Sequence, residues 1–109
     1  ETTAEKVAFG WHMDGKVAAV LGTHTHIPTA DERILPAGTA YQTDVGMTGP
    51  RHSVIGRQVE SCVGRFLDGL PRKCLVAEGD VGFQGAVLEI DHDTGLSRSI
   101  RRVEVREEV

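Results

Sequence analysis

Aromatic side chains are scarce in this sequence, and they make up 5% of its 109 residues, while hydrophobic residues together make up 39%. A chain this short buries a modest share of its surface on folding, so its core is thin unless something else covers it. The length fits one domain at most, and we expect residues 1–109 to form a single domain.

Cysteines are few, and long apolar runs are absent from the sequence. The two cysteines, Cys62 and Cys74, form no Cys-x-x-Cys motif, which argues against a disulfide framework and against a zinc knuckle. No apolar run approaches the roughly 18–20 residues that cross a bilayer, and no signal-peptide pattern opens the sequence. We therefore expect a cytoplasmic protein in a reducing compartment, with no membrane partner.

Charge of one sign is not concentrated in any large block. The formal net charge is −4, and the acidic residues are dispersed. The one basic cluster, SRSIRRVEVRE at residues 97–107, is interrupted by Glu104 and Glu107. Nucleic acid is therefore disfavoured as a bulk partner, and we interpret the cluster as a solvated strand face.

Two segments have helical patterns. The first has apolar residues at helical spacing from Ala4 to Trp11, and Thr2 with Glu5 has the form of a capping box. The second should begin at Ser53 as its N-cap and end at Gly69. Its apolar stripe, which we expect to pack on a sheet, consists of Ile55, Val59, Cys62, Val63, Phe66, Leu67 and Leu70.

Strand patterns account for much of the remaining chain, and a turn at Asp93–Gly95 should join the last two strands. The continuous apolar run at residues 16–22 is typical of a strand that is covered on both faces. The other candidate strands are residues 33–35, 39–46, 73–80, 81–91 and 96–107. Two helices and about six strands predict an α/β or α+β layer structure.

The run at residues 16–22 leads directly into a His-x-His motif, His24 and His26. Residues two apart in an extended chain point the same way, with Cα atoms about 6.5–7 Å apart. Neutral imidazole binds borderline metals well, and ligands of open α/β sheets bind beyond the carboxyl ends of strands. A purely structural role at the strand end is the alternative. We interpret His12, His52 and His92 as surface histidines.

The residues around this motif are more specific. GTHTHIPTADERILPAGTAYQTDVGMTGP, residues 22–50, closely resembles the C-terminal half of the YmdB-type bacterial phosphodiesterases, which are calcineurin-like metallophosphoesterases. The resemblance continues through SVIG, RFLDGLP, AEGD and LEID. It implies the C-terminal half of a four-layer α/β/β/α sandwich. It also implies that His24 binds the second metal of a dinuclear centre and that His26 binds the first.

The same resemblance places the start of the chain inside the family's domain. Family members carry a His-Ala-Glu stretch before a Thr-x-x-Glu-Lys helix, and Glu1 looks like that glutamate. We therefore expect the other metal ligands and the catalytic histidine to lie in an N-terminal half of the domain that this chain lacks. On this interpretation the chain holds no catalytic residue and is inactive alone.

The implied activity is hydrolysis of a phosphodiester, with 2′,3′-cyclic nucleotides as the leading substrates. Two metal ions roughly 3.5–4 Å apart can lower the pKa of a bridging water and clamp both oxygens of an in-line displacement. The resemblance implies divalent or mixed-valence iron or manganese, which suits a set of carboxylate, amide and imidazole ligands. A homo-oligomer is left open.

Further candidate residues surround the motif. Asp31 and Asp44 could hold the second ring nitrogens of the histidines, although we favour a loop or turn role for both. Gly46, Met47 and Thr48 could form a wall of the substrate pocket, because glycine lets the backbone approach a ligand, the hydroxyl can reach a phosphate oxygen and the thioether can contact a base. A plain turn is the alternative there.

Two interpretations of other classes remain. An amidohydrolase also uses His-x-His after a strand, but it needs a barrel with further ligands on later strands. An inactive binding or assembly module becomes the favoured interpretation if this chain is the complete protein in the cell.

Overall fold

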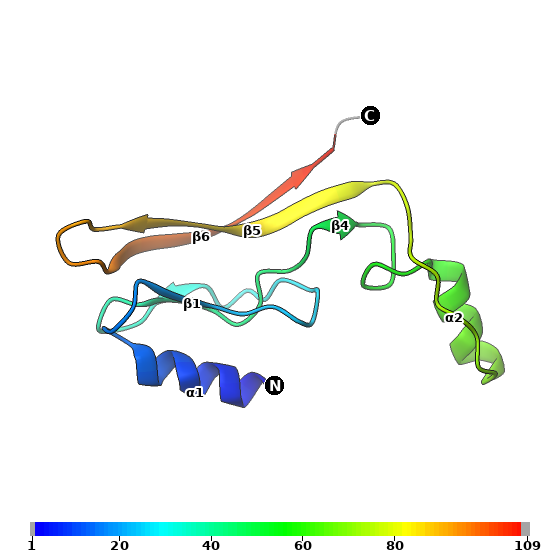
Figure 1. Cartoon of the computed structure of the whole chain (residues 1–109), viewed down its shortest axis with the longest axis horizontal. Helices are drawn as coiled ribbons and strands as arrows, with labels where there is room; N and C mark the ends of the chain where they lie inside the picture. Colours follow the sequence, from blue (N-terminus) through cyan, green and yellow to red (C-terminus); the bar gives the residue numbers. More distant parts are fainter. Residues whose placement is uncertain (1, 108–109) are drawn as a thin grey trace. The chain divides into compact units, whose positions relative to one another are not determined.

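The computed structural model of the protein describes residues 2–107 and contains, within them, two helices and six strands (Figure 1). The backbone forms two compact units. The first unit consists of the chain up to Met47 together with Gln84–Val103. The second consists of Thr48–Phe83 and the chain after Val103. Neither helix within the described residues has the length and apolar character to cross a membrane.

Helix α1, Thr3–Met13, begins at the predicted capping box. The Glu5 amide donates to Thr2 Oγ1 at 3.2 Å, and the Glu5 carboxylate accepts from the Thr2 amide at 3.2 Å. These reciprocal bonds satisfy two amides that have no partner inside the helix. The helix ends at Met13, and Asp14 is its C-cap. The interpretation placed on Glu1 lies outside the described residues.

The first unit contains a three-stranded sheet in the order β1-β3-β2, formed by Ala19–Leu21, Ala40–Gln42 and Arg33–Ile34. Strand β1 runs parallel to β3, and β2 runs antiparallel to it. All three strands were predicted, and the central strand β3 is fully buried. The expectation that β1 is covered on both faces is not met, because β1 is an edge strand in the described chain and Leu21 is 42% exposed.

Strands β5, Val81–Ile90, and β6, Ser97–Arg106, form the predicted last hairpin (Figure 1). Its turn is closed by the Gly95 amide, which donates to the Asp91 carbonyl at 2.7 Å. Strand β6 is mostly exposed, which confirms the solvated face that we predicted. Strand β4, Gly49–Pro50, was not predicted, and it pairs antiparallel with the start of β5.

Helix α2, Val59–Asp68, begins later than predicted, and Ser53 is not its N-cap. The Ser53 hydroxyl instead closes a turn, because it donates to the Pro50 carbonyl at 2.7 Å and accepts from the Gly56 amide at 2.9 Å. A serine can cap a turn as readily as a helix, and the sequence did not separate the two. The helix ends at Gly69, with φ of 66°, as predicted.

The apolar stripe of α2 does not pack on a sheet in the described chain, contrary to our expectation. Phe66 is 86% exposed and Leu67 is 82% exposed, whereas Cys62 is buried. The predicted strand at residues 73–80 is also absent, and this segment makes only an isolated bridge between Val76 and Arg57.

Candidate metal centre

The two histidines lie in bends that follow β1 directly. Both side chains are exposed, and both residues have positive φ angles, 112° for His24 and 70° for His26. Our assumption of an extended chain at this motif is therefore wrong. Such backbone costs about 1–3 kcal/mol per residue outside glycine, and it clusters at functional sites. The surrounding structure must hold this conformation in place.

The buried carboxylate of Asp44 holds the residue between the histidines. Its Oδ2 accepts from the Thr25 amide at 2.8 Å and from the Thr25 hydroxyl at 2.7 Å, and its Oδ1 accepts from the Gly46 amide at 2.8 Å. Burial alone would raise the pKa of Asp44, but the hydrogen bonds from Thr25 and Gly46 and the charge of Lys6 lower it below its ordinary value. Asp44 is therefore an anion at neutral pH.

The carboxylate of Asp31 joins the next part of the loop to β3. It accepts from the Thr29 hydroxyl at 2.6 Å and from the Thr43 amide at 3.1 Å, and it also accepts from the Thr43 hydroxyl. Burial would raise the pKa of Asp31, but these hydrogen bonds lower it. These contacts support the loop role that we favoured for Asp31 and Asp44. Their role at the ring nitrogens stays a prediction.

The structure requires a glycine at Gly22, the first residue of the Gly-x-His-x-His motif. Its amide donates to the Gln42 carbonyl at 3.0 Å, and its carbonyl accepts from the Val45 amide at 2.9 Å. A Cβ atom at this position would lie 1.9 Å from the Thr43 carbonyl oxygen. Only glycine lets the ends of β1 and β3 approach this closely, and this approach brings Asp44 beside the histidine loop.

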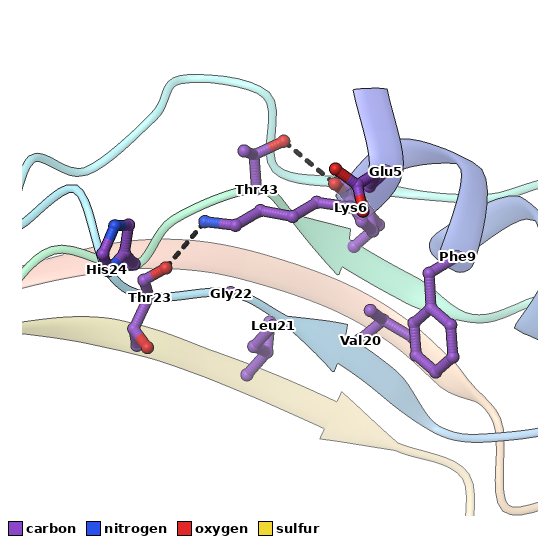
Figure 2. A pocket seen from close by; sticks show the side chains of 10 residues that line it. Glu5, Lys6, Phe9, Val20, Leu21, Gly22, Thr23, His24 and Thr43 are labelled. Atoms are coloured by element: carbon purple, nitrogen blue, oxygen red, sulfur yellow. Dashed lines mark hydrogen bonds between the residues drawn. The ribbon is translucent and has the colours of Figure 1, made fainter. Parts of the chain in front are cut away.

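A cavity of about 480 Å³ lies between α1 and the end of β1, beside His24 (Figure 2). Its lining includes Lys6, Phe9 and Leu21. The Lys6 side chain extends toward the histidine loop, and its Nζ donates to the Thr23 carbonyl at 2.6 Å (Figure 2). Sequence reasoning missed Lys6, because nothing in a helical pattern shows that a lysine reaches a loop from another element.

The predicted pocket wall, Gly46, Met47 and Thr48, does not line this cavity. Gly46 has a φ of 91°, and a Cβ atom there would lie 2.4 Å from Gln84 Oε1. The Met47 amide donates to the same oxygen at 3.1 Å. Close packing against β5 therefore accounts for the glycine. Thr48 is exposed and belongs to the second unit, and the substrate role of the three residues stays a prediction.

Within residues 2–107, one group of three side chains could hold a metal ion, namely Asp91, His92 and Asp93. Their possible ligand atoms all lie within 4.8 Å of one another. We interpreted His92 as a surface histidine, and its side chain is exposed, but it has the carboxylates of Asp91 and Asp93 beside it. The Asp91 carboxylate accepts from Arg98 at 2.7 Å and from the Asp93 amide at 2.8 Å, and these bonds lower its pKa. They close the hairpin turn, which explains the group without a metal.

The His24 and His26 pair gathers no third ligand of this kind from the described part of the chain. Two exposed imidazoles at the carboxyl end of a strand, with the residue between them fixed by a buried carboxylate, fit a role as two members of a larger ligand set. Imidazole ligands suit divalent transition metals.

Comparison with known proteins agrees with this fold. The chain superposes with a TM-score of 0.88 on a hypothetical protein from Thermus thermophilus, at 45% identity, covering 99% of this chain and 42% of the other. It superposes with a TM-score of 0.88 on a novel phosphatase from Mycoplasma pneumoniae, at 40% identity, covering 99% of this chain and 39% of the other. The α/β fold class is thus confirmed as that of phosphatase structures.

The family follows from the sequence match. The family described as YmdB-like protein matches residues 1–103, and the chain therefore belongs to this family. The chain is 48% identical over 108 residues to the 2′,3′-cyclic-nucleotide 2′-phosphodiesterase of Bacillus subtilis, and the match covers 99% of this chain and 41% of that enzyme. The chain thus spans about two fifths of the length of this curated relative.

Proposed function

We propose that the protein is a metal-dependent phosphodiesterase, and that this chain supplies His24 and His26 to a dinuclear metal centre. The main observation that supports this proposal is the His-x-His motif, which lies on strained backbone at the carboxyl end of β1. The residue between the histidines, Thr25, donates two hydrogen bonds to the buried carboxylate of Asp44. The names of the relatives, a cyclic-nucleotide phosphodiesterase and a phosphatase, support the reaction class. The proposed substrate is a small phosphodiester such as a 2′,3′-cyclic nucleotide.

The residues of this chain would act as ligands and as their supports. His24 and His26 would each hold one ion, which we propose to be iron or manganese. When bound, two such ions supply a water of lowered pKa and stabilise charge on the phosphoryl oxygens. Asp44 keeps the backbone between the two imidazoles fixed, so that both rings project from one short loop. The remaining ligands and the catalytic acid would come from the rest of the domain.

The contribution of Met47 and Thr48 to the substrate pocket is part of the same proposal. The Gly46 amide donates a hydrogen bond to Asp44 Oδ1. The loop that carries Met47 is therefore bonded to the same carboxylate that holds the histidine loop. The two loops would then form one polar rim. Thr48 has an exposed hydroxyl that is able to donate to a phosphate oxygen.

The structure argues against the amidohydrolase alternative. That fold needs a barrel of parallel strands, whereas β2 pairs antiparallel with β3 beside the motif. An inactive binding or assembly module remains the second candidate, since two ligands alone bind metal weakly.

The test is the substitution of each histidine in the full-length protein. His24→Ala and His26→Ala should each lower kcat toward bis(p-nitrophenyl) phosphate by about 100-fold or more, with loss of bound metal measured by mass spectrometry. His12→Ala on exposed helix α1 is the matched control, and it should leave both quantities unchanged. Full activity and full metal content in either loop variant would refute the proposal. A wild-type protein that binds metal without turnover would favour the binding module.

A further inference from the structure

Lys6 is a cation that is largely withdrawn from solvent beside the histidine loop. Its side chain is 14% exposed, although a lysine on a largely exposed helix such as α1 ordinarily extends into water. Its Nζ donates to the Thr23 carbonyl at 2.6 Å (Figure 2), and it also lies 3.8 Å from Asp44 Oδ2. The lysine thus connects α1 to the loop after β1 and to the carboxylate after β3.

The bonds of Lys6 and Asp44 fall on both sides of His24. Lys6 holds the carbonyl of the preceding residue, Thr23, and Asp44 holds the amide of the following residue, Thr25. The same oxygen, Asp44 Oδ2, receives the Thr25 donors and faces the Lys6 ammonium. The two peptide groups that set the φ and ψ angles of His24 are therefore both fixed by one ion pair.

This arrangement explains why His24 keeps its φ angle of 112°. A strained residue relaxes unless its neighbours are held, and an exposed imidazole supplies no packing that could hold it. Removing the ammonium would leave the Thr23 carbonyl without its donor. It would also leave the fully buried side chain of Asp44 without its counter-charge. Both losses act on the backbone that aims His24.

We infer that Lys6 is a positioning residue that holds the His24 loop in its metal-binding conformation before any metal is present. The inference rests on the proposed function for the role of His24, but the ordering of the loop is a separate property. Lys6 itself is neither a ligand nor a catalytic group, because its ammonium is engaged by Thr23 and Asp44.

The test uses Lys6→Met and Lys6→Arg in the full-length protein, with Lys16→Met as the control at an exposed lysine after α1. Mn²⁺ affinity would be measured by calorimetry on metal-free protein. Lys6→Met should weaken Mn²⁺ binding by about 10–100-fold, the usual effect of losing a residue that orients a ligand, and Lys6→Arg should restore part of it. KM should change little while kcat falls with metal occupancy.

A double substitution separates positioning from general destabilisation. Because Lys6 bonds Thr23 directly and also pairs with Asp44, Lys6→Met should weaken Mn²⁺ binding by a smaller factor in the Asp44→Asn protein than in the wild-type protein. Fully additive losses in affinity would mean that Lys6 acts elsewhere, and they would overturn the inference. An unchanged Mn²⁺ affinity in Lys6→Met would overturn it as well.

A metal-independent measurement keeps this inference distinct from the proposed function. Amide hydrogen exchange of Thr25 in metal-free protein should accelerate about tenfold or more in Lys6→Met, while the Ala40 amide in the sheet stays protected. If wild-type protein binds no Mn²⁺, the proposed function fails, and the exchange rate at Thr25 still decides whether Lys6 orders this loop. Unchanged exchange at Thr25 would refute the ordering.

Discussion

Replacing Asp31 by alanine should destabilise the first unit strongly. Its carboxylate accepts three hydrogen bonds, one from the Thr29 hydroxyl and two from the amide and hydroxyl of Thr43. Thr43 is only 4% exposed, so water cannot replace the carboxylate at its amide. The substitution therefore leaves a buried donor without a partner.

The expected loss follows from the three bonds. Each hydrogen bond to a charged group contributes about 1.5–3 kcal/mol, and contributions within one network do not add fully. The two hydroxyls have second partners, since Thr29 also lies 3.3 Å from the Asp44 carbonyl and Thr43 lies 3.0 Å from the Tyr41 hydroxyl. We therefore expect Asp31→Ala to cost about 3 kcal/mol, and Asp31→Asn, which keeps one acceptor, about 1 kcal/mol.

Urea denaturation followed by tryptophan fluorescence measures this directly. Trp11 is the one tryptophan of the sequence, and it lines a small cavity together with Asp31 and Tyr41, so its emission reports on the first unit. Asp93→Ala, on an exposed turn of the same unit, is the control and should change the free energy of unfolding by less than about 0.5 kcal/mol. An Asp31→Ala protein as stable as the control would refute the reasoning.

The same pair of proteins should show a defined pH dependence. Burial raises the pKa of Asp31 and its hydrogen bonds lower it, with a net value in the folded protein below the ordinary one. A carboxylate of this kind stabilises the fold above its unfolded pKa of about 3.9, and it loses that contribution as the pH falls through the folded pKa. The stability gap between wild type and Asp31→Ala should be constant above about pH 5 and shrink below about pH 4.

Two further predictions concern other parts of the chain. Gly22→Ala should lower the melting temperature by several degrees, because its Cβ would meet the Thr43 carbonyl oxygen at 1.9 Å, whereas Gly64→Ala in α2 meets nothing closer than 3.8 Å and should be neutral or stabilising. A hydrogen bond from Cys62 lowers the pKa of Cys74 and raises that of Cys62, so iodoacetamide should alkylate Cys74 first, as mass spectrometry would show. Equal labelling of the two thiols, or an unaffected melting temperature in Gly22→Ala, would contradict the respective prediction.

The parts of the fold that sequence reasoning predicted correctly are those whose signals are local. The capping box joins Thr2 to Glu5, which is 3 residues further along the chain, and the turn of the last hairpin is closed by a bond from Gly95 to Asp91. In such patterns both hydrogen-bond partners lie within a few residues of each other, so the sequence alone predicts them. A local signal can also be ambiguous. The N-cap predicted at Ser53 was wrong, because a hydroxyl that accepts from the amide 3 residues later can close a turn as well as begin a helix.

The geometry of the candidate site depends on distant partners, and it could not be predicted in this way. The histidines were found from their spacing and from the family resemblance, but their left-handed backbone was not. That backbone depends on Asp44, which is 19 residues from Thr25 in the sequence, and on Lys6, which is 17 residues from Thr23. A pattern of residue types does not show that these four residues meet.

The positions of these supports bear on when the proposed metal site becomes ordered. A His-x-His motif in a flexible loop would have to adopt its strained backbone as the metal binds, and the cost would be subtracted from the binding free energy. Here the peptide groups on both sides of His24 are bonded to Lys6 and Asp44, which are side chains of the first unit itself. The cost is then met during folding of the first unit, by a buried ion pair that connects α1, β1 and β3. It follows that substitutions in the support should weaken metal binding even though they remove no ligand, and that the order of effects should be histidines first, then Asp44 and Lys6.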